Sequence, residues 1–219
     1  MYDRKDHQVI THANQLANIE QNSVVLTFDD GPGRYLPRML DILKINKVPA
    51  VFFWQTRLLH PERPWKRLIE EGHMIGSHSC KHPDLRKMEY EEQYKELVCS
   101  KQKIEKITGQ LIRYFRPPFG QYKECTLLAL KKLNMIPVMW STASLDWELR
   151  DNPEQIIMNV VSHLEEGAII LLHELPQTLL VLPELISEIR SKGYSFSLLP
   201  PNPCIRCPTA SQGLPAMSR

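Results

Sequence analysis

Short runs of apolar and β-branched residues recur along the chain, and longer amphipathic segments separate them. Seven of these runs have the length and composition of buried strands. They are VVLTF (24–28), AVFFW (50–54), MIGS (74–77), IRYF (112–115), IPVMW (136–140), AIILL (168–172) and YSFSLL (194–199).

The segments between these runs carry helical signals. Helices are predicted over 61–71, 90–108 and 178–192, and each is followed by a glycine, the residue that most often ends a helix. Alternation of strand and helix predicts parallel β/α units, and seven units are nearly enough to close a barrel. The sequence therefore predicts an α/β fold, a distorted (β/α)7-8 barrel in a single domain.

The chain is expected to divide into three parts. Its 219 residues, 42% of them apolar, suit one compact core. Residues 22–200 contain every predicted strand and form the expected catalytic domain, preceded by an N-terminal extension over 1–21. Residues 201–219 are rich in proline and lack apolar periodicity, which predicts a flexible tail.

Charge and cysteine content exclude several classes of protein. The chain has 27 basic and 25 acidic residues and no basic block, so neither a nucleic acid nor a protein partner is indicated. Its five cysteines are odd in number and irregularly spaced, which predicts mostly free thiols. No signal peptide or membrane span is recognised. We therefore expect a cytoplasmic protein, unless the chain is truncated.

Polar residues follow five of the predicted strands, at the end where barrel enzymes build their active sites. They are Asp29 and Asp30 after the first strand, His78 and His82 after the third, Arg116 after the fourth, Asp146 and Trp147 after the fifth, and His173 at the end of the sixth. Each has an ordinary structural explanation when taken alone, such as a turn, a rigid loop or an exposed histidine pair. Their common placement favours a single site.

The types and spacing of these residues predict a metal site. Two adjacent carboxylates, Asp29 and Asp30, are costly to bury unless a cation compensates their charge. His78 and His82 are four residues apart, so a helical segment would present both imidazoles on one face. Two histidines and one aspartate leave a position for water, whose pKa falls toward ~7 on a metal. The other aspartate is suited to act as general base, and His173 to protonate a leaving nitrogen.

Five motifs, TFDDGP, HSCKH, RPPFG, SLDW and LLH, occur in order within residues 22–200. Through them the sequence resembles the polysaccharide deacetylases of carbohydrate esterase family four, the NodB-type deacetylase domain. The resemblance implies a metal-dependent hydrolase that removes N-acetyl groups from N-acetylhexosamine residues of a peptidoglycan-like or chitin-like glycan and releases acetate. It implies one divalent metal ion, most commonly zinc, and an N-acetylated glycan as partner.

The resemblance also implies roles for individual residues. Asp29 would be the catalytic base and Arg116 would orient it. Asp30, His78 and His82 would be the metal ligands. Ser79 would fix the histidine loop by hydrogen bonding.

The remaining roles concern the leaving group and the acetyl group. His173 would be the general acid, tuned by Asp146. The backbone N–H of Phe119 would stabilise the oxyanion. Trp147 and Leu171 would form the walls of the pocket for the acetyl methyl group.

Two positions depart from the commonest pattern of the family. Ala143 stands where many members have aspartate, although some members that act on muramic residues of peptidoglycan also have alanine there. Phe119 replaces a frequent tyrosine, but the role at this position belongs to the backbone. The resemblance also implies an extracellular or cell-wall location if the chain is truncated.

Two alternative functions remain open at this point. One is a related metallohydrolase that acts on a small amide, an imide or an O-acetyl ester. The other is a glycan-binding barrel without catalysis.

Overall fold

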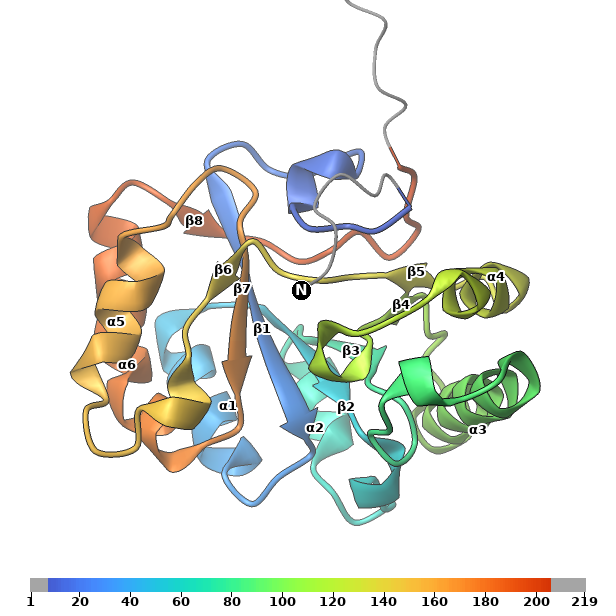
Figure 1. Ribbon diagram of the computed structural model, residues 1–219. Helices are drawn as coiled ribbons and strands as arrows, with labels where there is room; N and C mark the ends of the chain where they lie inside the picture. The colour runs from blue at the N-terminus through green and yellow to red at the C-terminus, as the bar shows by residue number, and fades with distance from the viewer. Residues whose placement is uncertain (1–7, 206–219) are drawn as a thin grey trace, which may run out of the picture.

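The computed structural model describes residues 8–205 and has one curled sheet surrounded by helices (Figure 1). All of its strand pairs are parallel, in the order β5-β4-β3-β2-β1-β7-β6, and β8 pairs with β1. The strands are β1 (Ser23–Gly31), β2 (Ala50–Trp54), β3 (Met74–Ser77), β4 (Tyr114–Phe115), β5 (Ile136–Pro137), β6 (Thr142–Ala143), β7 (Ile169–His173) and β8 (Ser195–Phe196).

Helices cover the outside of this sheet. They are α1 (Leu36–Asn46), α2 (Trp65–Glu70), α3 (Tyr90–Thr108), α4 (Glu124–Lys132), α5 (Glu154–Val161) and α6 (Pro176–Ser191). Figure 1 shows α1, α5 and α6 grouped on one side and α3 and α4 on the other. Within residues 8–205, no helix combines the length and apolar character needed to cross a bilayer.

The predicted α/β barrel is confirmed, in an open form with β5 and β6 at the two edges. Each of the seven predicted runs contributes a strand, and β6 is an eighth strand that apolar periodicity does not reveal because it has only two residues. Helix α3 has the predicted bounds and ends at Gly109, whose φ of 70° suits glycine. Helix α2 begins at Trp65, later than predicted, because Pro64 precedes it as the N-cap.

Both faces of the sheet are buried, and β1 shows how its side chains are divided. Leu26 and Phe28 pack in the core between the sheet and the helices, whereas Val25 packs in the interior of the barrel. Because side chains alternate along a strand, Thr27 and Asp29 share the interior side with Val25. The alternation therefore directs a carboxylate into the barrel at the end of β1.

The N-terminal segment connects β5 to the chain ahead of β7. The Ile10 N–H donates to the Pro137 carbonyl of β5, at 2.9 Å, and the Ala13 N–H donates to the Gly167 carbonyl ahead of β7, at 2.7 Å. Ile10 and Ala13 are fully buried. Figure 1 shows the segment at the end of the barrel where β1 begins, so it closes the end opposite the carboxyl ends of the strands.

The start of the predicted tail is paired with this segment. The Ala17 N–H donates to the Cys204 carbonyl, and Leu16 forms a bridge with Ile205. The rest of the predicted tail, with Cys207, lies outside the described residues, as do residues 1–7 of the predicted N-terminal extension.

The buried His73 predicts a pH dependence of stability. Its Nδ1 accepts the Ala50 N–H at 3.2 Å, and its Nε2 is buried without a partner. Burial lowers the pKa of His73 to about 4, against about 6.5 in the unfolded chain. The unfolded chain therefore takes up this proton at a higher pH than the folded chain does. The contribution of neutral His73 to the free energy of unfolding is fully present above pH 6.5. We expect up to roughly 3 kcal/mol of this to be lost as the pH falls from 6.5 to 4.

Urea denaturation at several pH values measures this loss. The His73→Asn variant keeps an acceptor for the Ala50 N–H and should show a shallower fall in stability over this range, whereas the exposed-site control His60→Gln should follow the wild type. Equal slopes for His73→Asn and wild type would contradict the assignment to His73.

Candidate active site

The sequence-predicted site residues converge at the carboxyl ends of the strands. A pocket of about 540 Å³ opens there. Eight of the ten residues line it: Asp29, Asp30, His78, His82, Phe119, Trp147, Leu171 and His173. The other two, Arg116 and Asp146, are fully buried, and each bonds to one of the pocket residues.

Asp29 is held by a buried ion pair. One terminal nitrogen of Arg116 donates to Asp29 Oδ1 at 2.8 Å and to the Thr27 hydroxyl at 2.7 Å. Two further donors of Arg116 bond to the backbone carbonyls of Val138 and Met139. Four of the five N–H groups of the guanidinium are used in these bonds, and Asp29 Oδ2 is left as the oxygen that faces the pocket.

A local irregularity of β1 turns Asp30 away from its neighbour. The pairing of β1 with β2 shifts between Asp29 and Gly31, and Asp30 has a φ of 68°. This bulge redirects the Asp30 side chain toward the histidines. The two carboxylates therefore diverge because of the bulge, and not through the alternation of side chains along a regular extended strand.

His78 and His82 lie in a loop, whereas their spacing had suggested a helical segment. The loop forms because Ser79 and His82 have left-handed φ values of 67° and 60°, and the His82 N–H donates to the Ser79 hydroxyl at 2.9 Å. This is the bond that the resemblance implied for Ser79. The two imidazole rings meet edge to face with their centres 4.8 Å apart.

The loop is also held from outside by α3. Glu96 Oε1 accepts the backbone N–H groups of Cys80 and Lys81, at 2.9 and 2.6 Å. Neither the HSCKH motif nor the apolar periodicity of α3 indicates a role for Glu96, because its partners in the loop are backbone N–H groups.

Three side chains form a set of metal donors. Asp30 Oδ1 lies 3.5 Å from His78 Nε2 and 3.4 Å from His82 Nε2, and one ligand atom from each residue lies within 4.8 Å of the others. Two imidazole nitrogens and a carboxylate oxygen are ligands that zinc and related divalent ions accept. These residues therefore fit a divalent cation.

The protonation of His78 follows from its second hydrogen bond. Its Nδ1 lies 2.7 Å from the Arg116 carbonyl oxygen, which can only accept, so Nδ1 carries the proton. Nε2 then has a free lone pair that faces Asp30. A backbone carbonyl that orients a ligating histidine in this way is a common arrangement around metals.

The electrostatics of Asp30 and His82 favour the forms that bind cations. Burial alone would raise the pKa of Asp30, but His78, His173 and His82 together with a hydrogen bond from Gln55 lower it. Burial and the neighbouring His78 lower the pKa of His82. Both shifts favour a carboxylate and a neutral imidazole.

His173 is oriented by Asp146 on the opposite side of the pocket. Asp146 accepts the His173 backbone N–H, the His173 Nδ1–H and the Thr178 hydroxyl, at 2.7, 2.7 and 2.6 Å. The Nε2 of His173 therefore points into the pocket, 4.0 Å from Asp30 Oδ2. Burial lowers the pKa of His173, but the bond and charge of Asp146, followed by Asp29 and Asp30, give a net increase.

Apolar groups surround this polar centre. The Trp147 ring meets His173 edge to face at 5.3 Å, and Leu171 lies on the floor of the pocket with 3% of its surface exposed. The Phe119 ring packs against His82 at 4.4 Å. No hydrogen bond among the described residues uses the Phe119 backbone N–H, which leaves it available to a ligand.

Backbone strain is concentrated around the pocket. Nine described residues other than glycine have left-handed φ values of 51–68°, and five of them lie in the pocket or in the loops that form it: Asp30, Ser79, His82, Phe119 and Leu145. Such conformations cost of order 1–3 kcal/mol each and persist only where surrounding contacts impose them. The left-handed residues in these loops therefore lower the free energy of unfolding, and other contacts must compensate for this loss.

Glu174 also lines the pocket, next to His173, although none of the five sequence motifs includes it. Its carboxylate accepts the Gly33 N–H at 2.6 Å and the Trp54 indole N–H at 3.1 Å. A Cβ at Gly31 would lie 1.7 Å from Glu174 Oε1, so the glycine of the TFDDGP motif makes room for it. Burial raises the pKa of Glu174 to about 7. In the sequence, only the position of Glu174 directly after the LLH motif indicates that it lies near the site.

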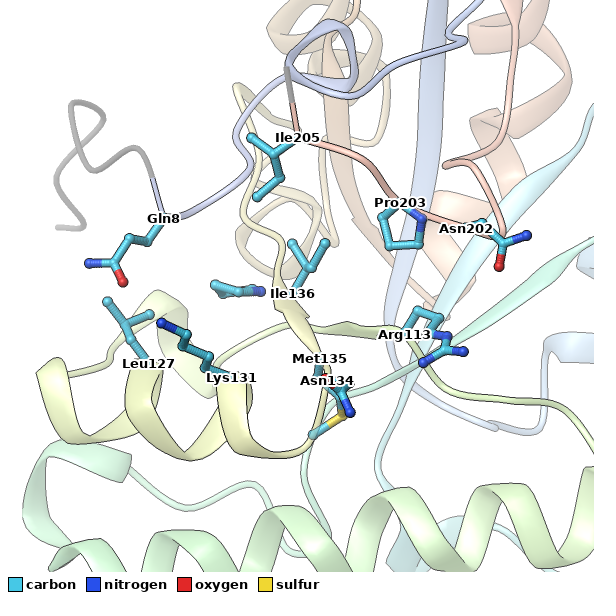
Figure 2. A pocket seen from close by; sticks show the side chains of 11 residues that line it. Gln8, Arg113, Leu127, Lys131, Asn134, Met135, Ile136, Asn202, Pro203 and Ile205 are labelled. Carbon is cyan, nitrogen blue, oxygen red and sulfur yellow. The ribbon is translucent and has the colours of Figure 1, made fainter. Parts of the chain in front are cut away.

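A second cavity, of about 560 Å³, lies elsewhere, between α4, β5 and residues 202–205. Figure 2 shows the side chains of Arg113, Lys131 and Ile136 at its wall. Its lining has no carboxylate or imidazole, so it lacks the metal donors and the carboxylate–histidine pair of the first pocket.

Comparisons with known proteins find deacetylases among the relatives of this chain. A family model described as "Polysaccharide deacetylase" matches residues 17–138. The peptidoglycan-N-acetylmuramic acid deacetylase of Bacillus subtilis (strain 168) is 33% identical over 187 residues, which cover 83% of this chain and 71% of that protein.

Solved structures share the fold. The Bc1960 peptidoglycan N-acetylglucosamine deacetylase, in complex with an N-hydroxybenzamide compound, has a TM-score of 0.78 and 28% identity over 86% of this chain and 89% of that chain. The wild-type BA3943 protein of Bacillus anthracis, described as a CE4 family pseudoenzyme, has a TM-score of 0.76 and 27% identity. That match covers 86% of this chain and 66% of the other.

Glu174 provides a test of how the TFDDGP turn is supported. The Glu174→Ala variant would leave the partly buried N–H of Gly33 and the buried indole N–H of Trp54 without an acceptor. We expect a loss of about 2–4 kcal/mol of stability, since each buried unsatisfied donor costs about 1–3 kcal/mol. Urea denaturation measures it.

Glu148→Ala is the matched control, because Glu148 also accepts an indole N–H, from Trp147, but at an exposed position. It should cost less than about 1 kcal/mol. Similar losses in both variants would show that the buried bonds of Glu174 do not support the turn.

Proposed function

This chain belongs to the polysaccharide deacetylase family, and we propose that it is a metal-dependent hydrolase that releases acetate from an N-acetylated glycan. One observation carries the proposal: a set of three metal donors lies in one pocket between the buried Asp29 and the pair of His173 with the buried Asp146. Peptidoglycan is the first substrate to test, since both deacetylases compared above are named for it.

Asp30, His78 and His82 are the residues that would hold the cation, for which we propose zinc. Once bound, a divalent ion lowers the pKa of water and polarises a carbonyl oxygen, which are the two effects that amide hydrolysis needs. The protein contributes the orientation of the donors, because the Arg116 carbonyl fixes His78 and the Ser79 hydroxyl fixes the loop at His82.

Asp29 is the proposed general base. Arg116 occupies Oδ1, and Oδ2 lies 3.8 Å from His78 Nε2, so this oxygen faces the metal donors without belonging to them. A carboxylate at this position can accept the proton of the attacking water. Arg116 acts through Asp29 and is a positioning residue.

His173 is the proposed general acid. Because Asp146 accepts the Nδ1 proton, only Nε2 can deliver a proton into the pocket. The raised pKa of His173 favours the protonated ring, which is the form that a general acid requires. Its proton would pass to the amide nitrogen, which then leaves as the amine of the sugar.

The remaining groups fit an acetyl amide. The unused Phe119 N–H can donate to the oxygen of the tetrahedral intermediate. Trp147 and Leu171 offer apolar walls that suit a methyl group. The same constellation would also act on a small amide, an imide or an O-acetyl ester, so the identity of the substrate is an outcome of the assay below.

A glycan-binding role without catalysis is the second candidate, because a similar structure is described as a pseudoenzyme. The presence in this chain of both proposed acid–base groups and of all three metal donors favours catalysis.

Acetate release tests the function. Metal-loaded protein should release acetate from peptidoglycan or from N-acetylglucosamine oligomers. Asp29→Asn keeps an oxygen for the Arg116 bond and leaves the metal donors intact, yet kcat should fall about 10²–10⁴-fold because the base is lost. An assay of acetate, with metal content measured in parallel, checks both effects. If Asp29→Asn releases acetate as fast as wild type, Asp29 is not the base; glycan binding without acetate release from any substrate would favour the second candidate.

The two histidine roles can be separated by metal content. His78→Ala should lose both the metal and the activity, since it removes a donor. His173→Ala should keep the metal while kcat falls about 10²–10⁴-fold. The exposed His163→Ala serves as a control and should match the wild type in both measurements. Equal loss of metal in His78→Ala and His173→Ala would overturn the assignment of His173 as the acid.

A further inference from the structure

Two cysteines meet beside the proposed metal site. Cys80 stands in the histidine loop, two residues after His78 and two before His82, and Cys99 lies on α3. Their Sγ atoms are 3.8 Å apart, with the Cys99 thiol donating to the Cys80 sulfur. Both are free thiols in this structure.

The position of Cys99 makes the pair accessible from solvent. Cys99 is exposed and lines a surface groove of about 460 Å³ along α3, together with Lys95, Lys103 and Lys106. Three lysine side chains line the same groove as this thiol, and their positive charge favours the approach of an anionic reagent. A low-molecular-weight disulfide that carries carboxylates has the chemistry that suits this groove.

We propose that Cys80 and Cys99 are a modification site at which an anionic low-molecular-weight disulfide oxidises them to a disulfide that ties the metal loop to α3. The Cys99 thiolate attacks the reagent, forms a mixed disulfide and releases one small thiol. The Cys80 thiolate then attacks the Cys99 sulfur, which forms the Cys80–Cys99 bond and releases the second small thiol. The two protein thiols are oxidised, the reagent is reduced, and the two thiol protons end on the two small thiols.

The surroundings of the pair indicate what the bond would do. A disulfide is about 2.05 Å long, so the sulfurs have to approach by less than about 2 Å. Glu96 already holds the N–H groups of Cys80 and Lys81 against α3. The helix itself is anchored by Leu97 and Ile104, both fully buried. The bond therefore reinforces a contact that exists in the reduced protein and does not pull the loop away.

The oxidised protein should hold its metal more firmly, because the loop that carries His78 and His82 then has a covalent tether. This part rests on the proposed function, whereas formation of the disulfide does not. Burial and the hydrogen bond to Cys80 raise the pKa of the Cys99 thiol, so the exchange should be run at alkaline pH.

The experiment uses the full chain loaded with zinc and then treated with oxidised glutathione. A peptide map under non-reducing conditions should show Cys80 linked to Cys99, and the count of free thiols should fall by two. Transfer of zinc to a chelator should become at least threefold slower and should recover after treatment with dithiothreitol. Cys99→Ser should show neither effect, whereas Cys204→Ser, which removes another exposed cysteine, should behave as wild type.

Several results would overturn the proposal. A stable mixed disulfide on Cys99, or pairing of either cysteine with another, would show that the two sulfurs do not join. A Cys80–Cys99 link with unchanged or faster loss of zinc would refute the effect on the metal. A protein that forms the link but binds no zinc before treatment would contradict the proposed function and the tether effect, while the cysteine pair itself would stand.

Discussion

The buried pair of Arg116 with Asp29 is the interaction on which the site depends. The guanidinium has no exposed surface, and it joins the end of β1 to the chain that follows β5 through bonds to Asp29, Thr27, Val138 and Met139. The backbone carbonyl of Arg116 also accepts the Nδ1–H of His78. Loss of one partner from such a pair costs about 3–5 kcal/mol, since a charge is left buried alone. One residue thus positions the proposed base and one of the proposed metal donors.

Around this pair, the fold gives similar side chains different environments. Asp29 and Asp30 are adjacent in sequence, but the bulge in β1 sends one toward an arginine and the other toward two histidines. His78 and His173 differ in the same manner: one has a backbone carbonyl behind it, and the other has a carboxylate. A neutral partner leaves an imidazole suited to bind a cation, whereas an anionic partner favours its protonated form.

The loops that carry these groups are held by contacts from outside the motifs. Glu96 on α3 supports the histidine loop, and Glu174 after β7 supports the turn that follows Asp30. Both carboxylates accept backbone N–H groups of strained segments. Because the left-handed residues in these segments cost stability, the supporting bonds are what keeps the donors in place. Rigid support of this kind is what a preorganised site requires.

The sequence by itself determined the architecture and eight of the residues that line the pocket. Strands β2 and β3 and helix α3 have their predicted bounds because apolar periodicity is a local property, and parallel strands necessarily bring their carboxyl ends together. Tertiary structure alone decided the rest: the loop conformation at His78 and His82, the bulge at Asp30, the pairing of β6, the support from Glu174 and the approach of Cys80 to Cys99. Each of these depends on hydrogen bonds or contacts with residues distant in sequence, and such contacts leave no periodic trace in the segment itself.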